Sequence, residues 1–224
     1  MIAFDPETGE LVGRADAVQA LLDGDERVEN KAFAAALAAA RAPVFRVWTE
    51  GFEPAATVLG DKSLCVLVTE RPDDQKALLP TTTARLPVAL VAWLGLSPRP
   101  TPEHPAIRLS PGQMAVVIGR GQAHGHDLAP EVANELQERL DAGVRHWTVR
   151  FARGGWRRNL EVLEGERGIW RVRPVEGELV ELAPTSTTAV VRELIALVLR
   201  ASAETESEPA RGPMIADQPA TPSD

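Results

Sequence analysis

The residues best suited to chemistry lie in one short segment, Gln122–Asp127, which has the sequence QAHGHD. The imidazoles of His124 and His126 and the carboxylate of Asp127 are ligand types that divalent metals accept. Three ligands so close together on a loop that contains Gly125 make a poorly preorganised site, and the other two histidines have no ligand spacing around them. We therefore expect a solvated loop here and no bound metal.

A second candidate is Val116–Gly121, which resembles the end of a dinucleotide-binding strand. Such a site needs a glycine-rich turn that opens directly into a helix, whose N-terminus holds the phosphates. Here the third glycine is displaced to Gly125, and no acidic residue follows on a strand at the distance of the ribose. Nucleotide or metal binding through the loop Gly119–Asp127 is thus the least favoured alternative, and we expect no cofactor.

Other catalytic patterns are missing from the sequence. It contains no nucleophile elbow, phosphate-binding loop or paired-carboxylate pattern, and it has no tyrosine. The single cysteine, Cys65, lies in an apolar strand pattern, which favours a small buried hydrophobic residue over a reactive thiol. We therefore expect a protein that binds a partner and is not an enzyme.

Arginine is concentrated between Arg145 and Arg173, where eight arginines accompany three glutamates in a chain of net charge −8. One interpretation is a solvated sheet face whose arginines pair with acids across strands. Another is a surface that meets an acidic protein partner. Nucleic acid is the least favoured ligand, because the overall charge is negative and the cluster has few interleaved aromatic residues.

Two aromatic residues are predicted at loop tips. Trp156 is flanked by arginines at one predicted hairpin tip, and Phe52 occupies a comparable turn earlier in the chain. Each aromatic ring either folds back onto its own sheet or anchors an interface, where Trp and Arg are enriched. The candidate partner-binding residues are Phe52, Arg153, Trp156, Arg157 and Arg158.

The elements that would position these residues fall into two similar units about 104 residues apart. The clearest match aligns Leu79–Thr83 with Ala183–Thr187, and each segment leads into a strongly apolar helix. Each unit has the pattern of a helix, three or four antiparallel strands and a second helix. In the second unit, Trp147, Val149 and Phe151 alternate with polar residues, as in a half-buried strand.

Capping residues mark where several predicted helices begin. Asn30 is placed to cap a helix over Lys31–Arg41, and Thr83 to cap a helix that ends near Leu94. Ser110 precedes a proline, which is the pattern of an N-cap followed by a first-turn proline.

The predicted fold class is α+β with two pseudo-duplicated halves. The N-terminal half covers residues 1–97 and the C-terminal half residues 98–200, together forming one bipartite domain. The two sheets could merge into one or pack as separate lobes. Residues 201–224 lack large apolar side chains, apart from Met214-Ile215 as a possible docking pair, and should form a disordered tail.

The apolar runs of the chain are too short to span a bilayer, and the acidic N-terminus has no signal-peptide pattern. We therefore expect a cytoplasmic protein, monomeric or homodimeric, with no membrane or nucleic-acid partner.

The sequence resembles the EspG-type family, the cytosolic chaperone-like proteins associated with ESX (type VII) secretion in actinobacteria. The resemblance covers most of residues 11–200. It is carried by Leu21–Asp25 and the following helix into Arg41–Pro43, by Ile107–Pro111, and by Glu166–Val172 followed by Leu182–Thr185 and the last helix.

The resemblance implies a non-enzymatic chaperone or adaptor that keeps a secretion substrate soluble before export. The substrates of that family are helical heterodimers with hydrophobic tips. This chain departs from the family at its N-terminus, where the opening strand would be missing or reduced to Met1–Phe4. The partner-binding loop of the family cannot be matched residue by residue. The alternative is a structural or regulatory protein-interaction module unrelated to secretion.

Overall fold

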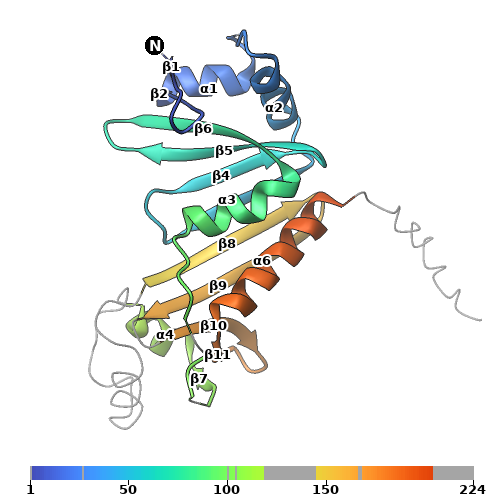
Figure 1. The fold of residues 1–224 in the computed structure, drawn as a ribbon. Helices are drawn as coiled ribbons and strands as arrows, with labels where there is room; N and C mark the ends of the chain where they lie inside the picture. Colours follow the sequence, from blue (N-terminus) through green and yellow to red (C-terminus); the bar gives the residue numbers. More distant parts are fainter. Residues whose placement is uncertain are drawn as a thin grey trace, which may run out of the picture.

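The computed structural model describes residues 2–26, 28–99, 101–103, 105–118, 145–165 and 168–203. These residues form an elongated molecule built around one twisted sheet with helices on both faces (Figure 1). The sheet has 11 strands in the order β1-β2-β6-β5-β4-β3-β8-β9-β10-β11-β7. Every neighbouring pair is antiparallel, so the fold is α+β with an antiparallel sheet.

The strands are β1 (Ile2–Asp5), β2 (Glu10–Arg14), β3 (Phe45–Glu50), β4 (Ala56–Gly60), β5 (Leu64–Arg71), β6 (Gln75–Thr82), β7 (Ile107–Leu109), β8 (Arg145–Arg153), β9 (Trp156–Gly165), β10 (Gly168–Val175) and β11 (Leu179–Thr185). The helices of the described residues are α1 (Ala15–Asp23), α2 (Lys31–Arg41), α3 (Leu86–Trp93), α4 (Pro111–Val117) and α6 (Thr187–Ser202), with a 3₁₀ turn η1 (Thr83–Arg85) before α3.

The two predicted sheets merge into one because β3 and β8 pair directly, with Thr49 opposite Val149. Outward from this central pair, the strand order is β4-β5-β6-β2 on one side and β9-β10-β11-β7 on the other. The residue pairing also repeats: Val66 lies opposite Pro80, and 104 residues later Trp170 lies opposite Pro184. The strand β1 has no counterpart among the described residues of the second side.

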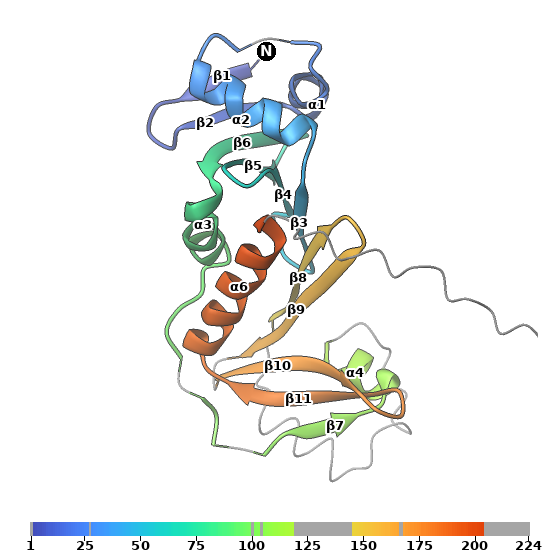
Figure 2. The same cartoon turned by 90° about the vertical axis from the view of Figure 1, so that its right-hand side faces the viewer.

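Helices α3 and α6 pack against each other and cover one face of the central strands (Figures 1 and 2). Their buried residues, such as Leu90 and Leu194, share one hydrophobic cluster with strand residues from both halves of the chain. Trp147, Val149 and Phe151 are fully buried in this cluster, as the alternating pattern predicts. The main core of the molecule therefore belongs to both halves.

The opposite face is covered only toward its two ends by the described helices. At one end α2 places Phe33 and Leu37 against Val66 and Leu78. At the other end α4 places Met114 in a cluster with strand residues of β7, β9, β10 and β11. Between these two ends lie the central strands β3 and β8 (Figure 2).

Several predicted boundaries need correction. Thr83 does not cap α3, because its hydroxyl donates to the carbonyl of Asp61 at 2.8 Å and the chain forms a 3₁₀ turn first. The tail begins later than residue 201, since α6 continues to Ser202 and Ala201 is fully buried. The predicted loop Gly119–Asp127 and residues 204–224 lie outside the described part of the chain.

None of the helices in the described ranges is long and apolar enough to cross a bilayer.

Candidate protein-binding surface

The β8–β9 hairpin brings four of the five candidate residues together. Arg153, the last residue of β8, lies opposite Trp156, the first residue of β9, and Gly154 and Gly155 form the two-residue turn between them. Gly154 has a φ of 52°, a backbone conformation that glycine adopts without strain. Arg157 and the neighbouring Arg158 follow at the start of β9, so that the arginines gather at one end of the central strands.

Phe52 lies elsewhere. It follows β3, which runs antiparallel to β8, so Phe52 is at the opposite end of the central strands from the β8–β9 turn. Its ring packs against Trp93 of α3, with 4.5 Å between ring centroids, and the guanidinium of Arg145 lies 5.0 Å from its centroid. Trp156 is likewise packed against the main core, with the guanidinium of Arg200 5.9 Å from its ring. Both aromatic rings therefore pack against the main core, which contains residues of both halves.

The side chains that do face outward come from the alternation of the central strands. Because Phe45, Val47 and Thr49 point toward α3 and α6, the residues between them point to the other face. The same alternation applies to β8 and to the start of β9. The resulting surface, here called the open face, consists of Arg46, Trp48, Arg150, Ala152, Arg157 and Asn159.

The open face is continuous across three strands. Trp48 lies opposite Arg150, which lies opposite Asn159, and Ala152 lies opposite both Arg46 and Arg157. Figure 2 shows that none of the described helices covers the β3–β8 pair on this side. This surface is therefore an accessible part of a sheet whose other side is core.

Two shallow hollows lie on the open face. One has a volume of about 590 Å³ and is lined by residues that include Arg46, Trp48, Ala152 and Arg157. A smaller one of about 250 Å³ shares Trp48 and Arg157 and is also lined by Arg150. Trp48, which is half-buried, thus contributes to both hollows and gives them an apolar wall.

The charge of the open face is mainly positive. Glu50, at the end of β3, pairs with Arg150 at 2.7 Å and accepts a hydrogen bond from the Trp48 indole at 3.3 Å. Arg46 and Arg157 are exposed and have no ion pair with the residues that the structure describes. An apolar ring flanked by exposed guanidinium groups suits a protein ligand with an apolar contact and nearby acids.

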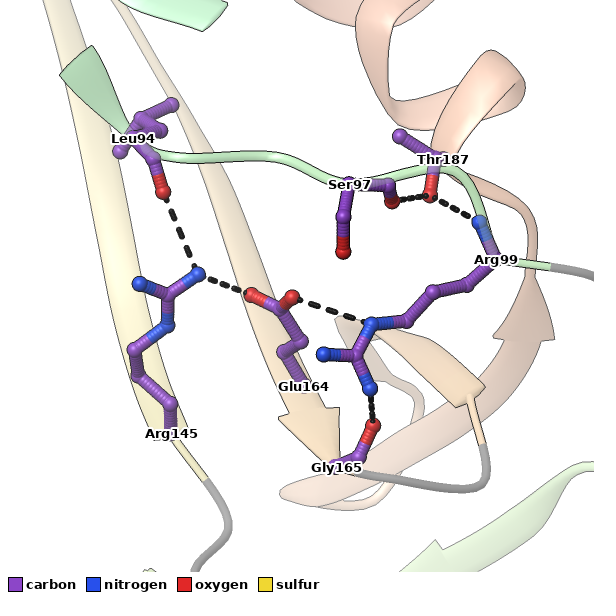
Figure 3. Close-up of polar contacts among 7 residues, drawn as sticks. All are labelled: Leu94, Ser97, Arg99, Arg145, Glu164, Gly165 and Thr187. Carbon is purple, nitrogen blue, oxygen red and sulfur yellow. Dashed lines mark hydrogen bonds and ion pairs between the residues drawn. The ribbon is translucent and has the colours of Figure 1, made fainter. Parts of the chain in front are cut away.

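On the α3–α6 side, a buried ion cluster fixes the connector that follows α3 (Figure 3). The carboxylate of Glu164 is only 4% exposed and pairs with both Arg145 and Arg99. Arg145 also donates to the carbonyl of Leu94 at 3.2 Å, and Arg99 donates to the carbonyl of Gly165. Two strands and the connector are therefore held by one carboxylate.

The same connector is attached to α6. The Thr187 hydroxyl donates to the carbonyl of Ser97 at 2.7 Å and accepts from the backbone N–H of Arg99 at 3.0 Å. These bonds hold the connector beside the start of α6 (Figure 3). Because the guanidinium of Arg145 also lies over the Phe52 ring, the ion cluster connects the β3–β4 loop to β8, β9 and the connector.

Sequence reasoning missed Trp48 and Glu164. The signal for Trp48 was present, because Phe45, Val47 and Thr49 alternate with Arg46, Trp48 and Glu50. Glu164 gave no such signal, since its arginine partners come from residues 99 and 145. No group of three or more potential metal ligands occurs among the residues whose placement is described.

Comparisons with known proteins give a fold but no family. A scan against protein-family models finds no match, and neither does a search of curated proteins. Among solved structures, the chain is similar to the type VII secretion system chaperone EspG5 of Mycobacterium tuberculosis, whose structure was determined in complex with a PE25–PPE41 dimer. The TM-score is 0.55 at 12% sequence identity, and the match covers 88% of this chain and 98% of EspG5. The chain therefore has an EspG-like fold.

Proposed function

We propose that this protein is a non-catalytic cytoplasmic chaperone or adaptor that binds a protein substrate of type VII secretion. The observation that carries the proposal is the similarity to EspG5, which extends over nearly the whole of both chains. EspG5 was captured with a PE25–PPE41 dimer, so that fold is able to hold a protein partner. The expected partner here is a helical secretion substrate with an apolar tip.

We further propose that the two halves arose by duplication of one unit. The repeat of residue pairing at 104 residues in β4–β6 and β9–β11 supports this origin. So do Phe52 and Trp156, which lie 104 residues apart and both pack against the shared core. Joining two such units through β3 and β8 doubles the width of the sheet and creates a central surface that neither unit has alone.

The proposed mechanism is burial of the partner's apolar tip on the open face. Trp48 and Ala152 supply apolar contact, while Arg46 and Arg157 bring positive charge to the edges of that contact. Burial of apolar area supplies most of the free energy of binding, and complementary charge sets orientation and association rate. Residues of the Glu164 cluster would act indirectly, by keeping the sheet and its helices in one arrangement.

The test is affinity capture from the native host with the full chain carrying a tag. In the double variant Trp48→Ala/Arg157→Ala, we expect loss of the co-purifying secretion substrate without loss of folding. The matched control is Val88→Ala/Arg85→Ala, which removes an exposed apolar residue and an exposed arginine from the α3 side.

The identity of the captured proteins separates the proposal from its alternative. Type VII substrates captured by the native chain and the control, and lost in the open-face variant, would support it. Capture of unrelated proteins would favour a structural or regulatory interaction module. Equal capture by both double variants would remove the open face from consideration.

A further inference from the structure

We propose that the larger hollow of the open face recognises an amphipathic helix that carries one acidic residue between two apolar residues. The carboxylate is held by Arg46 and Arg157, and the apolar residues contact Val44 and Trp48. This inference rests on the proposed function, because it names the chemistry that a protein partner must present to the open face.

Two apolar side chains line the hollow at positions four residues apart in the sequence. Val44, directly before β3, is 45% exposed, and its backbone N–H donates to the carbonyl of Gly60 at 2.8 Å. The indole N–H of Trp48 donates to Glu50, which restricts the ring to one position on the sheet. Four extended residues span about 13 Å, so that a ligand needs two apolar contacts at that separation.

Two arginines flank a small residue on the neighbouring strand. Ala152 lies opposite Arg46 on one side and opposite Arg157 on the other. The Cα atoms of the two arginines are therefore separated by two strand spacings, about 10 Å, with only a methyl side chain between them. One carboxylate accepts about four hydrogen bonds, so both guanidinium groups can bind the same one.

Neither arginine is neutralised by its own sheet. The neighbouring Arg150 pairs with Glu50 at 2.7 Å, whereas Arg46 and Arg157 are exposed and form no ion pair within the described part of the chain. Two unpaired positive charges at this separation repel each other in the free protein. A carboxylate from the partner removes this repulsion, so that it contributes affinity as well as orientation.

An α-helix presents side chains at the required spacing. Residues i, i+4 and i+8 lie on one face of a helix, about 6 and 12 Å along its axis from the first of them. Along the extended chain, Arg46 and Trp48 lie about 6.6 and 13 Å from Val44. A helix over β3 therefore brings its acid to the two arginines when its apolar residues reach Val44 and Trp48.

An extended peptide fits this surface less well than a helix. Such a peptide binds by adding a strand to the free edge of a sheet. Both edges of β3 are already paired, one with β4 and the other with β8. The backbone of β3 thus has no free edge to offer, and only its side chains are available for recognition.

The test uses the full chain and two fluorescently labelled, end-capped helical peptides of about 16 residues built from alanine and glutamine. The first peptide carries leucine, glutamate and leucine at positions i, i+4 and i+8, and in the second a glutamine replaces the glutamate. Fluorescence anisotropy at low salt should show about tenfold tighter binding of the glutamate peptide. The difference should shrink at about 0.5 M salt, where charges are screened.

Variants of the chain locate the effect. Arg46→Gln/Arg157→Gln should bind both peptides as weakly as the native chain binds the glutamine peptide. Arg46→Lys/Arg157→Lys keeps the charge without the bidentate geometry and should restore only part of the difference. Val44→Ala should weaken both peptides equally. The matched control, Arg85→Gln/Arg192→Gln, removes two exposed arginines from the α3–α6 side and should leave the difference unchanged.

Three results would each overturn the inference: no binding of either peptide, equal affinity of the native chain for both, or a preference for glutamate that survives in Arg46→Gln/Arg157→Gln. Full recovery in the lysine variant would overturn the bidentate grip on one carboxylate. The proposed function fails by a different result, which is affinity capture by the native chain that recovers no secretion substrate.

Discussion

At the scale of single residues, Glu164 shows how a side chain can organise long-range structure without being exposed. Its carboxylate lies on β9, and its two arginines come from β8 and from the connector after α3. The sequence Glu164-Gly165-Glu166 is typical of a turn, so the ion cluster could not be predicted from it. Gly60, which lies opposite Cys65 as Glu164 lies opposite Ile169, could not carry such a side chain, because an added Cβ would lie 2.4 Å from that of Cys65.

Replacing Glu164 should destabilise the protein. In Glu164→Gln two guanidinium groups lose their shared counter-charge, and we expect the free energy of unfolding to fall by about 3 kcal/mol, the low end for a broken buried pair. The low end applies because the Arg99 and Arg145 side chains are 29% and 40% exposed. Urea denaturation followed by tryptophan fluorescence measures the change.

The matched control for this prediction is the exposed Glu176→Gln, which should change stability by less than about 0.5 kcal/mol. Equal denaturation midpoints for the two variants would mean that the ion cluster contributes nothing.

Cys65 is the small buried residue that its strand pattern predicts, fully enclosed in the main core. Burial raises the pKa of its thiol from 9.0 to about 12. Between these values the unfolded chain loses the thiol proton while the folded chain keeps it, so stability falls as pH rises from 9 toward 12.

In Cys65→Ala this contribution is absent, and the free energy of unfolding should decline less steeply over the same pH range. Denaturant melts at several pH values compare the two proteins. Parallel pH profiles would show that the thiol is not protected. A disulfide-exchange reagent should likewise react with the native chain only as it unfolds.

At the scale of elements, local signals predicted helix starts where the capping residue was free to cap. Asn30 accepts hydrogen bonds from the backbone of Ala32 and Phe33, and Ser110 forms a capping box with Gln113. Thr83 failed as a cap because the fold engages its hydroxyl with Asp61, 22 residues earlier. The role of a loop-tip aromatic residue is likewise decided by tertiary contacts, since the Phe52 ring packs against Trp93 of α3.

Helix α6 offers an element-scale prediction. The Ser186 side chain accepts from the backbone N–H of Ala189 at 3.2 Å and caps the helix that crosses β8, β9 and β3. Ser186→Ala should lower the free energy of unfolding by about 1 kcal/mol, while Ser186→Asp should keep native stability because Asp caps equally well. Thermal denaturation distinguishes the two, and an equal loss in both variants would argue against a capping role.

At the scale of the whole molecule, the decisive feature is the pairing of β3 with β8. It joins Thr49 to Val149, and no local pattern predicts such a contact, so the sequence left merged and separate sheets as equal alternatives. The strands and the buried alternation could be predicted, whereas the open face could not, because it exists only where the two halves meet. We propose that the protein partner binds on that face, with Trp48 at its centre.

The most direct test is hydroxyl-radical footprinting of the protein alone and in complex with the purified protein partner that affinity capture identifies. This measurement reports side-chain accessibility, and Trp48 combines high reactivity with a half-buried position at the centre of the open face. We expect the oxidation of Trp48 to fall sharply in the complex, while that of Leu199 on the α6 surface is unchanged. Unchanged oxidation of Trp48 together with protection of Leu199 would contradict this expectation.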